Sequence, residues 1–127
     1  MKQVIVTTNA PKAIGPYSQA IKANGFVFVS GQLPINPATS TIEATDITGQ
    51  TDQALKNLKA ILAEAGCSLN DVVKNTVFLT DISNFAGMNE VYKQYFKEEC
   101  PARSAFAVKD LPLGALVEIE SIAALKV

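Results

Sequence analysis

Residues 117–123 read Val117-Glu118-Ile119-Glu120-Ser121-Ile122-Ala123, an alternation with the two-residue period of a β-strand. Side chains at every second position of a strand lie on the same face of its sheet. Glu118 and Glu120 therefore share one face, roughly 6.5 Å apart along the strand at a rise of ~3.3 Å per residue. The other face is largely apolar and carries Val117, Ile119, Ser121, Ala123 and Leu125. The pattern predicts a sheet with one buried face and one face that displays carboxylates.

An arginine begins the strand-like run that precedes this stretch. Arg103 follows Pro101-Ala102 and heads residues 103–108. A charge within a β pattern is costly unless it is paired, hydrated or used. The planar guanidinium suits a bidentate grip on a carboxylate, and the alternative is an ion pair with Glu118 or Glu120. In either case we expect the guanidinium to lie near the face that carries the glutamates.

Three acidic or aromatic positions allow both a functional and a structural interpretation. Glu118 and Glu120 can activate or position water, stand solvated on an exposed strand face, or bind cations. Tyr17 follows Gly15-Pro16, so its backbone is held in a restricted turn. Its ring either lies over a ligand or packs half-buried at the start of a strand.

Three further positions are candidate ligand contacts. Ser30 and Gly31 follow a predicted strand and offer a hydroxyl and a backbone that a ligand can approach closely, because glycine has no side chain. An ordinary strand-ending turn explains them equally well. Asn89 interrupts the apolar stripe of a predicted helix, where an exposed polar residue is the simpler interpretation.

The periodicity along the chain predicts the order β-β-β-α-β-α-β-β. The expected strands are residues 4–7, 18–21, 26–29, 72–80, 103–108 and 117–123, and the expected helices run between Asp46 and Gly66 and from Ser83 or Asn84 to Phe96. Two amphipathic helices cover only one face of a mixed sheet, so we expect a two-layer α+β domain. Symmetric oligomerisation is the simplest way to cover the other face.

Composition narrows the class of protein. A length of 127 residues fits one domain over residues 1–127, and 48% hydrophobic residues are enough for a core. A net charge of −1 does not suggest a nucleic-acid binder, and no membrane-spanning or secretory pattern is evident, so we expect a cytoplasmic protein.

The chain has no histidine, which excludes a Ser-His-Asp triad, a Cys-His dyad and most zinc sites. Cys67 and Cys100 match no metal-binding spacing. We therefore expect no metal site.

A series of short motifs follows the chain in order. They are Ile14-Gly15-Pro16-Tyr17-Ser18-Gln19, Ser30-Gly31-Gln32-Leu33-Pro34-Ile35, the expected helix from Gln53 to Gly66, Val77-Phe78-Leu79, Asn89-Glu90-Val91-Tyr92, Pro101-Ala102-Arg103-Ser104, and Leu111-Pro112 with Val117-Glu118-Ile119-Glu120. Together they resemble the RidA/YjgF family of reactive-intermediate deaminases, over nearly the whole chain.

The resemblance implies a chorismate-mutase-like fold and a homotrimer with a central β-barrel, helices outside and ligand clefts between subunits. It also implies hydrolysis of small enamine and imine acids, such as 2-aminoacrylate and 2-aminocrotonate, to 2-oxo acids and ammonia. The deaminase needs no cofactor, and its partners are a small 2-imino or 2-oxo acid and its own copies.

The same resemblance implies roles for individual residues. Arg103 holds the substrate carboxylate, and Glu118 positions water for attack at the imine carbon. Tyr17 lines the cleft from the neighbouring subunit. Ser30, Gly31 and Asn89 are pocket residues.

One position departs from the family pattern. Ala105 stands where the family often has cysteine. Its backbone is expected to touch the ligand, and alanine preserves that contact.

Two other functions stay open. The cleft could sense a small carboxylate in a regulatory protein, for example one acting on purine genes. Relatives have also been labelled translation inhibitors or ribonucleases, but the near-neutral charge and the missing histidine argue against action on RNA.

Overall fold

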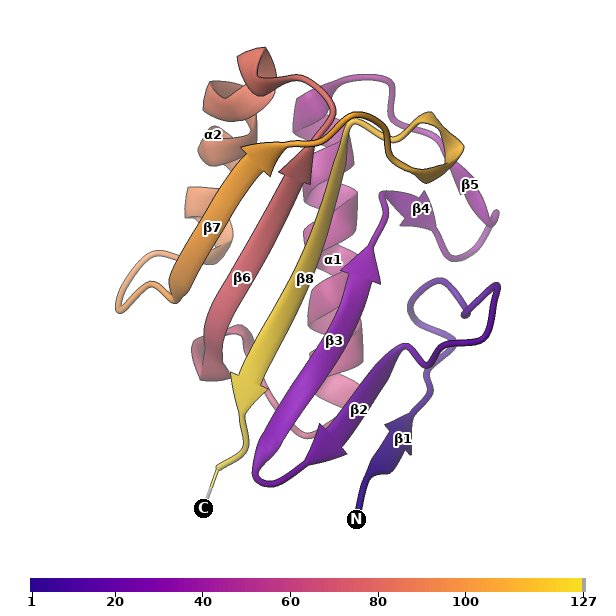
Figure 1. Ribbon diagram of the computed structural model, residues 1–127, viewed down its shortest axis with the longest axis vertical. Helices are drawn as coiled ribbons and strands as arrows, with labels where there is room; N and C mark the ends of the chain where they lie inside the picture. Colours follow the sequence, from indigo (N-terminus) through magenta and orange to yellow (C-terminus); the bar gives the residue numbers. More distant parts are fainter. Residues whose placement is uncertain (127) are drawn as a thin grey trace.

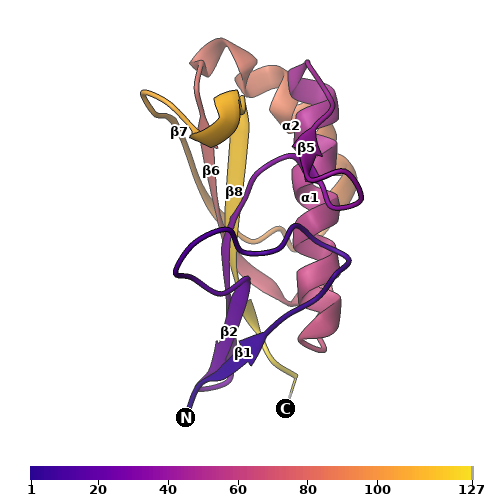
Figure 2. The ribbon, with the colours of Figure 1, turned by 90° about the vertical axis from the view of Figure 1, so that its right-hand side faces the viewer.

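The computed structural model describes residues 1–126 as two layers, a six-stranded sheet with two α-helices on one face. The strands of the large sheet are β1 Gln3–Ile5, β2 Ala20–Ala23, β3 Phe26–Gln32, β6 Val72–Leu79, β7 Ala102–Ala107 and β8 Val117–Ala124. The helices are α1 Ile47–Glu64 and α2 Phe85–Tyr95. Seen edge-on, both helices lie on the same side of the sheet (Figure 2). The predicted two-layer α+β fold is confirmed.

The strand order is β1-β2-β3-β8-β6-β7. All neighbours are antiparallel except β6 and β7, which are parallel and joined through α2, as parallel strands require a crossover. The last strand, β8, therefore lies in the middle of the sheet, between β3 and β6 (Figure 1).

The alternation in β8 has the predicted consequence. Val117, Ile119 and Ala123 are fully buried, and Ser121 is only 3% exposed. Glu118 and the other residues of the opposite face are partly or fully exposed. The buried face packs against α1, whose apolar stripe of Leu55, Leu58, Ile61 and Leu62 is fully buried.

Local capping and turn chemistry also agree with the sequence. The side chain of Asp46 accepts a hydrogen bond from the Gly49 N–H at 2.9 Å and caps α1. Gly66, just beyond α1, adopts the left-handed φ of +86° expected of a helix-ending glycine. Asn24 and Gly25 have φ of 51° and 81° and form the tight turn between β2 and β3.

Two local predictions need correction. Asn84 occupies the N-cap position of α2, but its side chain makes no capping hydrogen bond. The side-chain cap lies on the short 3₁₀-helix Ile82–Asn84 just before α2, where Asp81 accepts from the Ser83 N–H. The segment between β3 and α1, for which the sequence predicts no strand, contains a short hairpin, β4 Ile35–Asn36 and β5 Thr41–Ile42. Strands of two residues are too short to show a periodic pattern.

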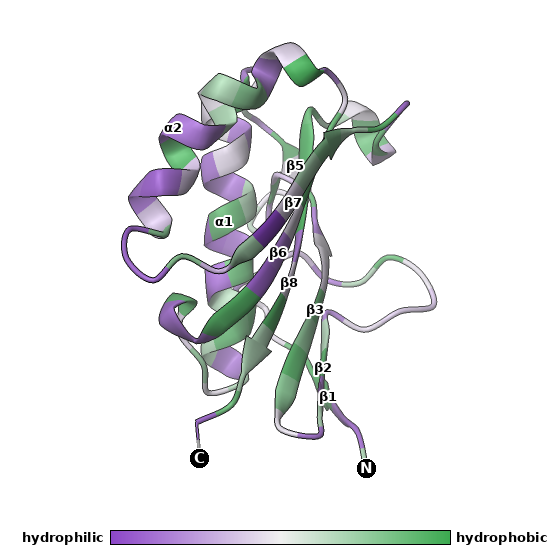
Figure 3. Ribbon diagram, turned by 60° about the vertical axis from the view of Figure 1, so that its left-hand side comes forward, coloured by the Kyte–Doolittle hydropathy of each residue, from purple (hydrophilic) through white to green (hydrophobic). Residues whose placement is uncertain are grey.

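The face of the sheet away from the helices, here called the open face, is apolar in part. One row across β1, β2, β3 and β8 consists of Val4, Ile21, Phe28 and Ile122. Phe28 is 44% exposed, and Phe106 on β7 is 46% exposed. Figure 3 shows a hydrophobic stretch in the first part of β3. A single chain leaves these residues uncovered.

Among residues 1–126, neither helix is both long and apolar enough to span a membrane.

Candidate functional site

Arg103, the second residue of β7, is held against α2. Its Nη1 donates a hydrogen bond to Asn89 Oδ1 at 2.7 Å. The guanidinium carbon lies 4.8 Å from the ring centre of Tyr92 and 5.4 Å from that of Phe85. The charge is therefore held by an amide oxygen and two aromatic faces, which attract a cation through the ring quadrupole.

The three partners of Arg103 form one stripe along α2. Phe85, Asn89 and Tyr92 are spaced i, i+4 and i+7, which places them on the same side of a helix. The simpler interpretation of Asn89, an exposed polar residue, is therefore wrong. Tyr92 belongs to the hydrophobic core and Phe85 packs against it, and both rings also contact Arg103. The i, i+4, i+7 spacing around Asn89 is the sequence pattern that could have identified them as arginine contacts.

The expectation that Arg103 lies near the glutamate face is wrong within one chain. Arg103 pairs with Asn75 of β6, which is fully buried beneath the helices. Glu118 pairs instead with Phe78, which is an odd number of positions from Asn75 on β6. The side chains of Phe78 and Asn75 therefore lie on opposite faces of the sheet, and Glu118 lies with Phe78 on the open face. The ion pairs between residues 1–126 do not include Arg103, so the predicted alternative of a pair with Glu118 or Glu120 is also absent there. The parallel pairing of β7 sets this side, and the sequence of β7 alone does not reveal it.

The guanidinium borders a pocket of about 320 Å³ between α2 and the start of β7. Asn89, Tyr92 and Arg103 line it together with Glu90, Lys93, Phe96, Cys100 and Pro101. Ala105 follows Arg103 on the same face of β7, is partly buried and packs against the core. We call Arg103, Asn89, Phe85, Tyr92 and Ala105 the arginine half-site. Because β7 is the edge strand, part of its backbone has no partner strand.

Glu118 lies against the backbone of Gly31. A Cβ atom at position 31 would come within 2.8 Å of the Glu118 Cδ, so the carboxyl group occupies the space that a side chain would need. The β3–β8 pairing shifts register between Val29 and Gln32, which leaves Ser30 and Gly31 in a β-bulge. Ser30-Gly31 is therefore a bulge inside the sheet and not a simple strand-ending turn.

The environment of Glu118 favours its protonated form. Burial of the half-buried side chain raises the pKa of Glu118, and the nearby negative charge of Glu120 raises this pKa further. A raised pKa makes a carboxyl group a better proton acceptor, which suits it to general acid–base catalysis.

Tyr17 comes from the long connection between β1 and β2, which Figure 2 shows passing from the helix side to the open side of the sheet. The buried Gln19 side chain holds this connection: it accepts from the Thr7 N–H at 2.7 Å and donates to the Pro11 carbonyl at 2.8 Å. Ser30 Oγ donates to the Ser18 carbonyl at 2.6 Å, next to Tyr17. The Tyr17 side chain itself is 50% exposed.

A chain of contacts on the open side therefore joins four residues. Tyr17 precedes Ser18, whose carbonyl accepts from Ser30, and Gly31, the next residue, lies against the Glu118 carboxyl group. We call Tyr17, Ser30, Gly31 and Glu118 the glutamate half-site. The structure thus gathers the predicted site residues into two groups, one on each face of the sheet, and does not bring the groups together in one chain.

The sequence and the fold have counterparts among known proteins. A sequence profile described as Endoribonuclease L-PSP, the RidA/YjgF family, matches residues 7–125. The chain belongs to the RidA/YjgF family. This family member is 60% identical to a RutC family protein of Pyrococcus horikoshii over 97% of this chain and 98% of the relative.

Two further relatives of this RidA/YjgF member have names or ligands that bear on activity. The human 2-iminobutanoate/2-iminopropanoate deaminase is 46% identical over 97% of this chain and 90% of its own length. The crystal structure of E. coli TdcF with bound serine superimposes with a TM-score of 0.93 at 46% identity, covering 98% of this chain and 99% of that one. The resemblance predicted from the motifs is confirmed.

Proposed function

We propose that this protein is a hydrolytic deaminase that converts small 2-imino acids, and the enamines that tautomerise to them, into 2-oxo acids and ammonia. The proposal rests above all on the two half-sites: a guanidinium without a carboxylate partner among the described residues lies on one face, and a glutamate with a raised pKa lies on the other. In a closed assembly, the arginine half-site of one subunit would complete the glutamate half-site of the next.

Arg103 is suited to hold the carboxylate that all these substrates share. A guanidinium has five N–H donors, and Asn89 takes one of them at Nη1. The remaining donors can make two parallel charge-assisted hydrogen bonds to a carboxylate.

Glu118 is suited to the proton transfers of imine hydrolysis. As a carboxylate it accepts a proton from water while the water oxygen bonds to the imine carbon. It returns this proton to the nitrogen, which gives a carbinolamine. The hydroxyl proton of the carbinolamine, which is the second proton of the water, then also moves to the nitrogen, and ammonia leaves as the C–N bond breaks and the carbonyl forms. Atoms balance with one water consumed, and no oxidant or reductant is needed.

The open face supports a homotrimer. Its exposed row includes Phe28 and Val4, which are 44% and 51% exposed. Contiguous exposed apolar surface is unusual on a monomer and is typical of an interface. Three copies that cover this face would bring opposite half-sites together at each subunit boundary.

A binding protein for small carboxylates is the second candidate. The TdcF structure was obtained with bound serine, which carries a carboxylate but no imine. The same two half-sites would then hold a ligand without hydrolysing it.

The deciding experiment measures 2-oxobutyrate formation from freshly generated 2-aminocrotonate. We expect the parent protein to accelerate it, and Arg103→Lys to lose roughly 30-fold or more in kcat/KM, since lysine cannot copy the guanidinium fork. Glu118→Gln should lower kcat while leaving the affinity for 2-oxobutyrate within a few-fold.

Glu120→Gln is the matched control, because Glu120 is an exposed glutamate two residues further along the same face of β8. It should retain the parent rate at pH 8. A parent protein that binds 2-oxobutyrate but leaves the spontaneous rate unchanged would contradict the deaminase and favour the binding protein.

A further inference from the structure

Tyr92 lies between Arg103 and a buried chain of hydrogen bonds. We propose that Tyr92 is a positioning residue, which orients the guanidinium of Arg103 for a ligand carboxylate before the ligand arrives. This inference rests on the proposed role of Arg103 and adds a residue that holds the arginine in place.

The guanidinium of Arg103 lies over the face of the Tyr92 ring. The Arg103 Cζ is 4.8 Å from the ring centre, and the Tyr92 residue is only 7% exposed. Because the ring is embedded in the core, it cannot follow the arginine as a surface residue would. The orientation of the guanidinium therefore depends on where the core holds this ring.

Two buried polar residues anchor the hydroxyl end of the ring. Asn75 Nδ2 donates to Tyr92 Oη at 2.9 Å, and Ser121 Oγ donates to Asn75 Oδ1. Asn75 is fully buried and Ser121 is 3% exposed. Buried polar groups of this kind are costly unless each finds a partner, so apolar residues would be the cheaper filling between sheet and helix.

The chain of hydrogen bonds from Ser121 through Asn75 to Tyr92 connects three elements of the fold. Ser121 belongs to β8, Asn75 to β6 and Tyr92 to α2. Burial raises the pKa of Tyr92, so its hydroxyl stays neutral in the working range and can accept the Asn75 hydrogen bond. The guanidinium on β7 is thus held relative to the centre of the sheet.

Holding the arginine should change affinity more than turnover. A free arginine side chain loses considerable rotamer freedom when it binds a carboxylate. A guanidinium already fixed by Asn89 and Tyr92 has lost that freedom before binding, which strengthens the complex. Since the carboxylate is gripped equally in substrate and transition state, weakening the grip should raise KM and leave kcat nearly unchanged.

The test compares Tyr92→Phe and Tyr92→Met in the intact oligomer. Methionine packs adaptably in cores but has no ring face. We expect Tyr92→Met to raise the KM and the Kd for 2-oxobutyrate by a factor of about 5 to 30, with kcat within about twofold. Tyr92→Phe keeps the ring but frees it from Asn75, so we expect a rise of about two- to fivefold.

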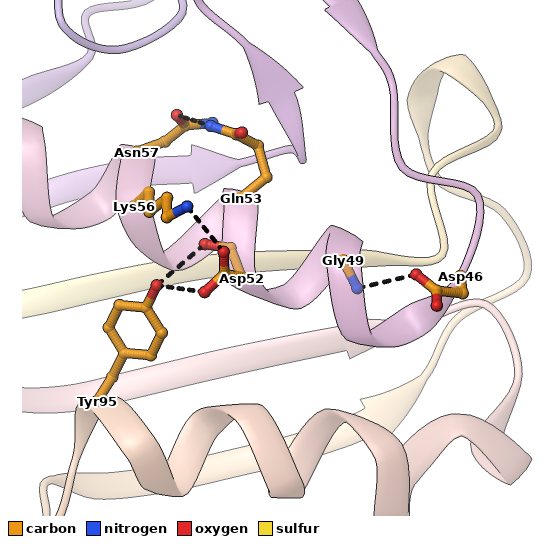
Figure 4. A network of polar contacts seen from close by, with 7 residues as sticks. All are labelled: Asp46, Gly49, Asp52, Gln53, Lys56, Asn57 and Tyr95. Atoms are coloured by element: carbon orange, nitrogen blue, oxygen red, sulfur yellow. Dashed lines mark hydrogen bonds and ion pairs between the residues drawn. The ribbon is translucent and has the colours of Figure 1, made fainter.

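Tyr95→Phe is the matched control. Tyr95 is also on α2, and its Oη donates to Asp52 Oδ1 at 2.5 Å in a network separate from Arg103 (Figure 4). The variant loses a part-buried hydrogen bond between α2 and α1, so its thermal stability should fall while KM and Kd stay at the parent values.

Three outcomes would overturn the positioning role. The first is a folded Tyr92→Met variant that binds 2-oxobutyrate within twofold of the parent. The second is a Tyr95→Phe variant that binds as weakly as Tyr92→Met. The third is parent-like binding by Tyr92→Phe, and this result alone decides the question if Tyr92→Met does not assemble. Arg103→Lys separates the two proposals. If it also binds like the parent, the proposed site itself fails; if it loses binding while the Tyr92 variants do not, only the positioning role fails.

Discussion

Glu118 and Glu120 are neighbours on one face of β8 but have different environments. Glu118 is half-buried with its carboxyl group against Gly31, whereas Glu120 is exposed. Burial is the larger cause of the raised pKa of Glu118, and the charge of Glu120 is the second. The two effects can be separated because one depends on position and the other on a replaceable charge.

Glu120→Gln should therefore shift the pH dependence of deamination. Removing the Glu120 charge lowers the pKa of Glu118, so the active carboxylate persists to lower pH and the acidic limb of the kcat/KM profile moves to lower pH. The measurement is kcat/KM for fresh 2-aminocrotonate between pH 5 and 9, corrected for the spontaneous rate. An acidic limb that stays in place or moves to higher pH would show that Glu118 does not carry the titration.

At the scale of elements, the bulge in β3 brings backbone and carboxylate together. The register shift between Val29 and Gln32 leaves Ser30 and Gly31 without regular pairing opposite β8. Ser30 is then free to bond the Ser18 carbonyl, and Gly31 leaves room for Glu118. One irregularity thus joins β3, β8 and the β1–β2 connection into the glutamate half-site.

Gly31→Ala should displace Glu118 at little cost to folding. The new Cβ would meet the end of a flexible side chain, which can swing away, so the melting temperature should fall by only a few degrees. The displaced carboxyl group should lower kcat by about tenfold or more. Enzyme kinetics and thermal unfolding measured together check this, and unchanged kcat would mean that the position of Glu118 is not critical.

At the scale of the whole molecule, the two half-sites lie on opposite faces of one sheet. A single chain therefore holds Arg103 and Glu118 apart, and the proposed chemistry requires a second copy. Activity measurements on mixed assemblies can therefore test whether the site is shared between subunits.

Co-expressed Arg103→Lys and Glu118→Gln chains should recover activity that neither has alone. In mixed trimers about a quarter of the subunit boundaries would combine an intact Arg103 with an intact Glu118, so activity should approach a quarter of the parent value. Light scattering should give about three chain masses for every sample.

The control pairs Arg103→Lys with the Arg103→Lys/Glu118→Gln double variant, which cannot form an intact cleft and should stay inactive. Mixed trimers without recovery would contradict a cleft shared between subunits.

Local patterns in the sequence were enough for much of this architecture. The alternation in residues 117–123 predicted a strand with one buried face, and Asp46 and Gly66 predicted the limits of α1. Asn24-Gly25 is a pair typical of a tight hairpin turn, and it forms the β2–β3 turn. Such features depend on side-chain period and backbone conformation within a few residues, so they can be inferred without the rest of the chain.

The side of the sheet on which Arg103 lies depends on long-range pairing. The parallel alignment of β7 with β6 puts Arg103 beside Asn75 and beneath α2, and β8 enters between β3 and β6 from the far end of the chain. A shift of one residue in that pairing would have reversed the face. The roles of Phe85 and Tyr92 were hidden for the same reason: an aromatic stripe on a helix has the same period whether it covers apolar core or a guanidinium, and the packing of strand against helix determines which.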